Sequence, residues 1–409
     1  MNNYYLDKLK KIYDEYEEFN NKKIPLCAAE TYMSDFVRQG MSSIFEGKYI
    51  QGYKTRIIDK DNIGSNKIYP LLALVEELCT EIYGATYVDS RTLSGMNCMA
   101  ILIMSLINKN STVAITLKET GGHPSLANIL DNLGITYLGI PYDFKSYQID
   151  YDALNKMLKS NKIDFLIFCQ SDILSVPDFS KIKLPNTTGL IYDGSQTLGL
   201  MAANLVPNPL NYSERVILIG GTHKTLPGPT CGLIMTCYKE YIDKLDYTIS
   251  PTLLRNIQPN NIAALCLALI EQLETNFEYE KKIQDTANIL GKKLEERNIS
   301  VAKINAEKYT NTHQLFLLFN EQLTETIYKR ALKYNITLNK RVSKLYTGIR
   351  IGVQEISRYN YTETDLDKVA DLLYLLQKND EDEKKIYQKC QCLQSLKAPC
   401  YILNDIFMV

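Results

Sequence analysis

The sequence predicts an α/β fold built on a mostly parallel sheet, followed by a smaller α+β unit. Three observations support this: the chain has 409 residues, 45% of them are hydrophobic, and strand-like and helix-like segments alternate from about residue 70. Such alternation is typical of parallel strands whose connecting helices cover both faces of the sheet. The predicted strands are 113–117, 135–140, 165–169, 189–192 and 216–219, and the predicted helices are 71–83, 98–107, 125–133 and 151–159.

The remaining segments predict four parts along the chain. A long helix is expected from 262 to 273, continued by 277–296, and the smaller unit then has strands at 314–319 and 348–352 and helices at 324–334 and 364–377. Residues 5–20 predict a surface or interface helix, and the charged stretch 378–389 predicts a solvated linker. The predicted parts are an N-terminal helical arm (1–25), a large domain (26–275), a small domain (276–378) and a linker with a cysteine-containing tail (379–409).

Composition excludes several kinds of partner. A formal net charge of −1 gives no basic field for nucleic acid or an anionic membrane. No stretch reaches the roughly 18 apolar residues of a membrane span, and the charged N-terminus is unlike a signal peptide. The ten scattered cysteines favour reduced thiols and a cytoplasmic location. Cys390, Cys392 and Cys400 cluster without a fourth ligand, so no metal is expected, and a packing or redox role stays open.

Lys224 is the first candidate for chemistry. The segment Thr222-His223-Lys224-Thr225 follows a strand-like run and precedes the turn residues 226–229. A lysine held at a strand end is partly desolvated, which lowers its pKa and suits an amine that forms a Schiff base. A surface lysine in a turn remains the alternative.

Two further segments fall at strand ends or helix starts. Asp193 follows an apolar strand, where a buried carboxylate could keep a pyridine nitrogen protonated; a helix N-cap is the alternative. Ser94-Gly95-Met96 precedes a predicted helix, and the N–H groups there could cradle a phosphate. A plain turn is the alternative for that segment.

Two more residues complete a set. His123 follows two glycines and could stack on a cofactor ring, and Arg350 lies in an apolar strand, where its guanidinium fits a substrate carboxylate or pairs with a core carboxylate. Lysine, aspartate, phosphate turn, histidine and arginine together are what a pyridoxal-phosphate enzyme needs. They predict pyridoxal 5′-phosphate as the cofactor, bound by the large domain.

The same segments resemble serine hydroxymethyltransferase, a family of fold-type I pyridoxal-phosphate enzymes. The resemblance runs from about Leu26 to Leu376, and each of the three histidines stands where the family has one. It implies a large domain with a mostly parallel seven-stranded sheet and a smaller C-terminal domain. The segments that carry it are THKTLPGPTCGLI (222–234), YDGSQTLGLMAA (192–203), TGIRIGVQEISRYNY (347–361), AAETYMSDFV (28–37) and GKYIQGY (47–53).

The resemblance implies a role for each matching residue. Lys224 would carry the cofactor as a Schiff base, Asp193 would pair with the pyridine nitrogen and His123 would stack on the ring. Ser171 matches a serine near the ring hydroxyl, and Tyr49 matches a tyrosine that reaches the neighbouring subunit's site, which implies a homodimer. The resemblance further implies cofactor contacts from Ser94, Gly95, Met96, Gln196, Thr222 and His223 and substrate contacts from Ala29, Tyr53 and Arg350.

Five departures from the family pattern bear on the reaction and on cofactor binding. Gln51 stands where the family has its acid/base glutamate, and an amide cannot shuttle a proton. Gln196 replaces a histidine but can still hydrogen-bond a ring oxygen, and Gln354-Glu355 replaces Pro-Ala, as in the threonine transaldolase branch. Arg255 stands in a segment that binds the partner subunit's phosphate, where it could compensate for Met96, which replaces a phosphate-binding serine; a surface arginine is the alternative.

The resemblance and its departures therefore imply an aldol-type reaction on a small β-hydroxy amino acid or glycine, with an aldehyde as acceptor, by an aldolase or transaldolase. Ordinary folate-dependent hydroxymethyl transfer is an alternative that Gln51 disfavours. Another pyridoxal-phosphate reaction, such as transamination, elimination or decarboxylation, is a second alternative. A catalytically dead relative with a binding role is a third, and the retention of Lys224, Asp193 and Arg350 argues against it.

Overall fold

The structure is a computed structural model that describes residues 4–50, 64–378 and 383–404. It forms two compact units. The large unit comprises Ala29–Gln284, Lys303–His313 and Tyr401–Val409, and the small unit comprises Met1–Ala28, Asp285–Ala302 and Gln314–Cys400. Each unit combines segments that are distant in the sequence. The four parts expected from the sequence follow the chain instead, and their boundaries stay a prediction.

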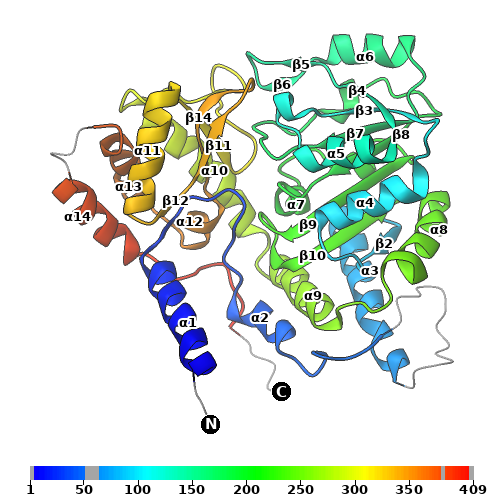
Figure 1. The fold of residues 1–409 in the computed structure, drawn as a ribbon, viewed down its shortest axis with the longest axis horizontal. Coiled ribbons are helices and arrows are strands. Elements are labelled where there is room, and N and C mark those ends of the chain that lie inside the picture. The colour runs from blue at the N-terminus through cyan, green and yellow to red at the C-terminus, as the bar shows by residue number, and fades with distance from the viewer. Residues whose placement is uncertain (1–3, 51–63, 379–382, 405–409) are drawn as a thin grey trace. The chain divides into compact units, whose positions relative to one another are not determined.

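The large unit is organised by a seven-stranded sheet with the order β2-β10-β9-β8-β7-β3-β4 (Figure 1). β10 is antiparallel to both of its neighbours, and the pairs from β9 to β4 are parallel. The mostly parallel α/β fold expected from the sequence is therefore confirmed. The strands are β2 (Tyr87–Asp89), β3 (Thr112–Ile115), β4 (Thr136–Gly139), β7 (Phe165–Cys169), β8 (Gly189–Asp193), β9 (Val216–His223) and β10 (Pro227–Thr236).

Helices of the large unit cover this sheet and bury its apolar residues. Helix α4, for example, packs on β9 and β10 and contributes Cys98, Met99 and Ile101 to the core. The helices are α2 (Asp35–Met41), α3 (Tyr69–Tyr83), α4 (Gly95–Leu106), α5 (Pro124–Leu133), α6 (Tyr151–Ser160), α7 (Leu198–Ala202), α8 (Lys239–Tyr247) and α9 (Pro259–Glu274), and the short strands β5 (Tyr142–Asp143) and β6 (Gln148–Ile149) form a separate hairpin.

Parallel pairing brings the carboxyl ends of the central strands to one edge. β7 and β8 align so that Cys169 lies opposite Asp193, and β8 and β9 align so that Asp193 lies opposite Ile219. The end of β8 therefore lies beside the strand that leads to Lys224, and the end of β7 lies next to β8 on its other side. Ligands of open α/β sheets bind outside this edge.

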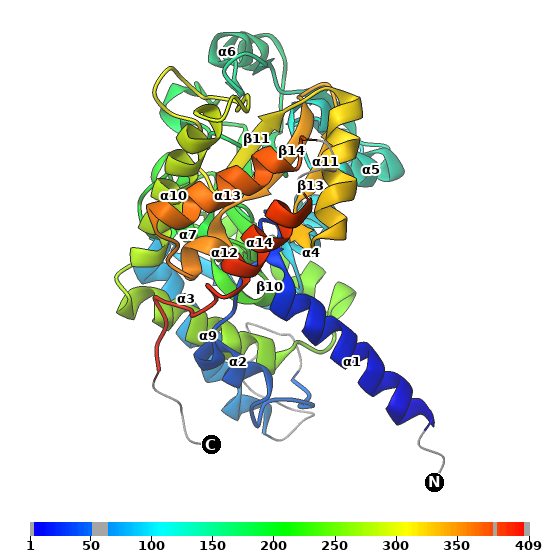
Figure 2. The same cartoon turned by 90° about the vertical axis from the view of Figure 1, so that its left-hand side faces the viewer.

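The small unit contains a three-stranded antiparallel sheet, β11-β14-β13, and a two-stranded parallel pair, β1-β12. Figure 2 shows α13 and α14 of this unit, which pack against each other. Its elements are α1 (Tyr4–Lys22), β1 (Ile24–Pro25), β11 (Gln314–Leu318), α11 (Glu321–Lys333), β12 (Ile336–Thr337), β13 (Asn339–Val342), β14 (Thr347–Gly352), α12 (Gln354–Arg358), α13 (Glu363–Leu375), α14 (Glu383–Gln394) and the last part of α10 (Glu278–Glu295).

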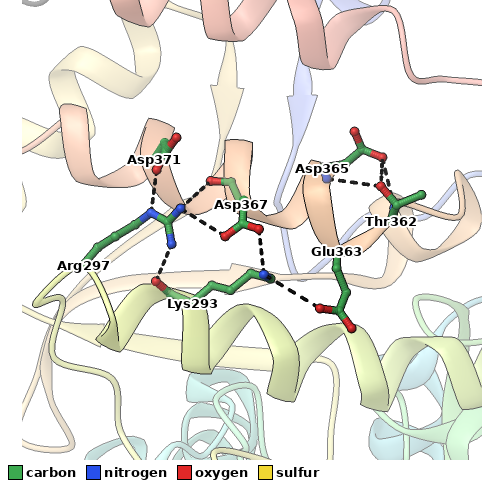
Figure 3. Close-up of polar contacts among 7 residues, drawn as sticks. All are labelled: Lys293, Arg297, Thr362, Glu363, Asp365, Asp367 and Asp371. Atoms are coloured by element: carbon green, nitrogen blue, oxygen red, sulfur yellow. Dashed lines mark hydrogen bonds and ion pairs between the residues drawn. The ribbon is translucent and has the colours of Figure 1, made fainter.

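Charged side chains join the end of α10 to α13 within the small unit (Figure 3). Lys293 Nζ lies 2.8 Å from Asp367, and the Arg297 guanidinium reaches Asp367 at 3.1 Å and Asp371 at 2.6 Å. The hydrogen bond from Lys293 lowers the pKa of Asp367. Helix α13 begins at a capping box in which Thr362 and Asp365 bond each other's backbone N–H groups, which fixes the start of the helix.

Three local expectations from the sequence were wrong. The charged stretch expected to be a linker contains the start of α14, which buries Ile386, Cys390 and Leu393 at helical spacing. The long helix is interrupted after α9, where Asn276 and Phe277 have positive φ angles of 50° and 54° before α10 begins. Residues 227–229, expected to be a turn, begin strand β10.

No helix among the described residues is long and apolar enough to span a membrane. All ten cysteines lie in the described part of the chain, and none forms a disulfide. No cluster of three or more metal-ligating side chains occurs in the described ranges.

Candidate active site

Lys224 lies in the tight connection between the antiparallel strands β9 and β10. His223 pairs with Pro227, so Lys224 and two further residues form the whole turn. Hydroxyl groups hold the backbone on both sides: Thr222 Oγ1 donates to the Pro229 carbonyl oxygen at 2.6 Å, and Thr225 Oγ1 donates to the Gln196 carbonyl oxygen at 3.2 Å. The turn therefore fixes the base of the lysine side chain, in keeping with a rigidly held amine.

Asp193 ends β8 and its carboxylate accepts hydrogen bonds at both oxygens. Oδ1 accepts from the Ser195 backbone N–H at 2.9 Å and from Ser195 Oγ at 2.5 Å, and Oδ2 lies 3.2 Å from Cys169 Sγ. Helix α7 begins later and has Thr197 at its N-cap position. Asp193 is therefore not a helix N-cap, which was the alternative left open by the sequence.

The charges of Asp193 and Lys224 act on the same neighbours. Burial lowers the pKa of His123, Asp193 raises it, and Lys224 lowers it. Burial raises the pKa of Cys169 well above its usual range, Asp193 raises it further, and Lys224 opposes this. The carboxylate and the amine therefore meet in one electrostatic environment around His123 and Cys169.

His123 directly precedes α5 in the chain and lies next to the end of β7 in space. It is held at two atoms. Its backbone N–H donates to the Cys169 carbonyl oxygen at 2.7 Å, and its Nδ1 accepts from the Ser125 backbone N–H at 3.2 Å. With a lowered pKa and an accepting Nδ1, the ring is neutral near pH 7 and carries its proton on Nε2. A neutral, fixed imidazole is suited to stacking on a planar ring.

Helix α4 begins directly beside the end of β8. Ser94 is its N-cap and accepts from the Asn97 backbone N–H at 3.2 Å. A Cβ added to Gly95 would lie 2.5 Å from Ser195 Oγ and 2.9 Å from the Gly221 nitrogen, so only glycine fits this contact. The first turn of α4, including the half-buried Met96, is thereby brought to the same sheet edge.

Other candidate residues surround this edge through backbone contacts. The Ser171 N–H donates to the Gly121 carbonyl oxygen at 2.8 Å, beside His123, and Gln196 is buried next to Asp193. His223 Nδ1 is buried and has no hydrogen-bond partner within the described ranges. A buried polar atom without a partner costs free energy unless a ligand or water satisfies it.

The remaining candidates lie elsewhere or outside the described residues. Tyr49 is 44% exposed, Arg255 is exposed and Ala29 is partly exposed, all in the large unit. Arg350 belongs to the small unit, where its Nη2 donates to Asn339 Oδ1 at 2.8 Å from a buried position on β14. Gln51 and Tyr53 fall within 51–63, outside the described residues.

Sequence reasoning missed two residues of this arrangement, Cys169 and Ser195. A serine two positions after an aspartate is a pattern that often closes a turn on the carboxylate, so Ser195 had a local signal. Cys169 had none, because its contact with Asp193 depends on the pairing of β7 with β8.

The arrangement fits pyridoxal phosphate. It combines a lysine on a fixed turn, a carboxylate with oriented oxygens, a neutral imidazole, and a glycine at a helix start beside them. The unpartnered Nδ1 of His223 adds a polar atom available to a ligand.

Comparisons with known proteins point in the same direction. The family model "Serine hydroxymethyltransferase" matches residues 5–373. A serine hydroxymethyltransferase of Thermoplasma volcanium is 28% identical over 389 residues, covering 91% of this chain and 90% of that protein. The crystal structure of L-threonine transaldolase from Pseudomonas fluorescens in its internal aldimine state superposes with a TM-score of 0.88 at 23% identity, covering 96% of this chain and 92% of that one. The chain therefore belongs to the serine hydroxymethyltransferase family and is a pyridoxal-phosphate-dependent enzyme of the transferase type.

Proposed function

We propose that this enzyme catalyses an aldol-type reaction on a small β-hydroxy amino acid or glycine, with Lys224 as the lysine that binds the cofactor. The observation that carries the proposal is the shared environment of Lys224 and Asp193, whose charges both act on the pKa values of His123 and Cys169. When bound, pyridoxal phosphate withdraws electrons from the Cα atom of an attached amino acid.

Each residue of the edge has a separate task in this proposal. The Lys224 amine would hold the cofactor through its aldehyde carbon. Asp193 holds a proton at the pyridine nitrogen through a carboxylate that is already oriented by two neighbours. His123, neutral and fixed, covers one face of the ring. The first turn of α4, with Ser94, Gly95 and Met96, binds the phosphate through its N–H groups.

Seven more residues contribute to ring and substrate binding in the proposal. Ser171 and Gln196 lie at the strand ends where they could bond the ring oxygen, and Thr222 and His223 flank the lysine. For the substrate, Arg350 offers a guanidinium that is planar and already oriented by Asn339, which suits a carboxylate. Ala29 and Tyr53 are the further substrate-binding candidates.

The choice of an aldol-type reaction over folate-dependent transfer rests on Gln51. The family has a glutamate there that acts as an acid and base, and a glutamine can hydrogen-bond but cannot transfer a proton. Retro-aldol cleavage of threonine or serine needs no folate, so it does not depend on the one-carbon transfer for which the family uses that glutamate. An aldehyde would be the natural second substrate in the reverse direction.

Folate-dependent hydroxymethyl transfer is the second candidate, favoured by the family match and by the Thermoplasma relative. A screen of the holoenzyme separates the two. We expect acetaldehyde release from threonine and visible spectral change with glycine, both independent of tetrahydrofolate. The matched variant Gln51→Glu should gain tetrahydrofolate-dependent cleavage of serine. Serine cleavage that strictly requires tetrahydrofolate in the unaltered enzyme would contradict the proposal, and keto-acid formation would favour transamination instead.

We further propose a homodimer with shared active sites. Helix α1 buries none of its residues, yet Leu9, Ile12, Tyr13 and Tyr16 form an apolar stripe that is 50–69% exposed. Such a stripe is costly in water and suits a second copy of the chain. Exposed Tyr49 and Arg255 would then reach the neighbouring site, Arg255 at the phosphate. If Arg255→Ala left pyridoxal-phosphate affinity unchanged, that role of Arg255 would be excluded.

The cytoplasm is the proposed location, because none of the ten cysteines is in a disulfide.

A further inference from the structure

The Ser195 hydroxyl joins two strands at the candidate site. It donates to Asp193 Oδ1 at 2.5 Å and accepts from the Gly221 backbone N–H at 2.8 Å. Asp193 ends β8 and Gly221 lies on β9, three residues before Lys224. One hydroxyl therefore uses its donor on the carboxylate and an acceptor lone pair on the strand that leads to the lysine.

The same hydroxyl also contacts the start of helix α4. A Cβ on Gly95 would lie 2.5 Å from Ser195 Oγ, so the first residue of the helix packs directly against it. Ser195 is thus in contact with the end of β8, with β9 and with the N-terminus of α4. These elements carry the carboxylate that is proposed to pair with the pyridine nitrogen, the lysine, and the turn that is proposed to bind the phosphate.

Cys169 holds the other oxygen of the carboxylate. Its Sγ lies 3.2 Å from Asp193 Oδ2. Burial and the neighbouring carboxylate raise the pKa of Cys169 well above its usual range, so the sulfur stays protonated and donates. Each oxygen of Asp193 therefore has its own side-chain donor, which fixes the plane of the carboxylate. Oδ1 accepts from both the N–H and the hydroxyl of Ser195, whereas Oδ2 accepts only from Cys169 and keeps a lone pair for a further donor.

We propose that Ser195 and Cys169 are positioning residues that orient Asp193 toward the pyridine nitrogen and set how tightly it holds the proton there. Ser195 also keeps the lysine strand and the phosphate helix in register with that carboxylate. This inference rests on the proposed role of Asp193. It extends the set of groups that tune the cofactor to two residues that do not touch the substrate.

The test compares Ser195→Ala with Ser357→Ala as the matched control. Ser357 is also a buried serine, and its hydroxyl donates to the Val353 carbonyl oxygen at 2.8 Å in the small unit. Pyridoxal-phosphate affinity is measured by titrating the apoprotein, and the visible absorption of the holoenzyme is recorded against pH. We expect Ser195→Ala to weaken cofactor binding about tenfold, as for one lost hydrogen bond to a charged group. It should also shift the pH at which the visible band titrates. Ser357→Ala should change neither.

The outcomes separate the two levels of the inference. A Ser195→Ala holoenzyme with unaltered affinity and pH titration overturns the positioning role, provided that Asp193→Asn changes both. If Asp193→Asn also changes neither, the proposed role of Asp193 itself is wrong. Should Ser195→Ala not fold, Cys169→Ala removes the donor on the other oxygen. An unaltered pH titration in that variant overturns the inference equally.

Discussion

At the scale of single residues, the departure from the family pattern at Gln354-Glu355 has a structural role, because Glu355 takes part in a buried ion pair. Lys23 Nζ lies 3.2 Å from Glu355 Oε1, both side chains are less than 10% exposed, and the Tyr359 hydroxyl donates to Glu355 at 3.1 Å. Gln354, beside it, donates to the Cys27 carbonyl oxygen at 2.7 Å. Both residues of the departure therefore have structural contacts within the small unit.

Removing one partner of that pair should be costly. Glu355→Ala leaves the Lys23 ammonium buried without its carboxylate, so we expect the free energy of unfolding to fall by about 3–5 kcal/mol. Urea unfolding measures this change. Glu363→Ala is the control, because its carboxylate is 75% exposed and 4.0 Å from Lys293, and such pairs contribute at most about 1 kcal/mol. Equal losses in the two variants would show that the Lys23–Glu355 pair does not stabilise the fold.

The two histidines of the site should make the apoprotein sensitive to mild acid. Burial lowers the pKa of both His123 and His223, and Lys224 lowers both as well. The unfolded chain then takes up protons at a higher pH than the folded chain. The stability due to the neutral rings is present above the ordinary histidine pKa of about 6.5 and is lost as the pH falls through the lower folded values.

The measurement is the urea midpoint of the apoprotein at pH 7.5 and at pH 5.5. We expect the drop between these values to be smaller in His223→Asn than in the unaltered chain. The same drop in both proteins would mean that His223 is not held neutral by burial.

At the scale of elements, helix α14 shows where charge patterning misled the sequence interpretation. Its many charged residues suggested a solvated linker, but Ile386, Cys390 and Leu393 recur at helical spacing and are buried. Tyr361, which follows α12, donates to the Leu393 carbonyl oxygen at 3.1 Å. In the prediction from sequence, the high charge of the segment outweighed its narrow apolar stripe.

The packing of α14 predicts that substitutions at two adjacent residues have different effects on the free energy of unfolding. Ile386→Ala removes a fully buried side chain and should lower the free energy of unfolding by about 2–5 kcal/mol. Tyr387, the next residue, is 57% exposed, and Tyr387→Ala should change it by less than about 0.5 kcal/mol. Denaturant unfolding compares the two. A negligible loss in Ile386→Ala would indicate that α14 is not docked in solution.

Elements with strong local patterns were predictable, whereas those defined by long-range pairing were not. The helices α3, α5 and α6 and the apolar strand β7 match the expected segments closely, because periodicity and burial are local signals. Strand β10 was missed because Pro227 and Pro229 are turn residues in most settings. Here they lie beside a register shift between Pro227 and Gly232, where an irregular strand tolerates proline.

The residues of the candidate site also differ in whether a local sequence signal could reveal them. Lys224, Asp193 and the Ser94–Met96 turn could be proposed because each falls next to a recognisable strand or helix boundary. The contacts of Cys169 with Asp193 and of Gly95 with Ser195 join segments distant in the chain, so only the fold reveals them.

At the scale of the whole molecule, the proposed dimer predicts how the chain behaves in solution. Light scattering after gel filtration should give about twice the chain mass of 46.7 kDa. Ile12→Glu places a charge in the apolar stripe of α1 and should shift the protein toward the monomer, while Lys11→Ala, outside the stripe, should not. A monomer of unaltered sequence at micromolar concentration would contradict the dimer and the shared sites.

The Lys224 amine is expected to carry the cofactor. Borohydride reduction of the holoenzyme, followed by peptide mass spectrometry, tests it most directly, because reduction fixes the cofactor on the lysine that holds it. We predict a single phosphopyridoxyl group on Lys224 in the unaltered enzyme and none in the Lys224→Ala variant. Stoichiometric labelling of another lysine, or equal labelling of Lys224→Ala, would contradict the account.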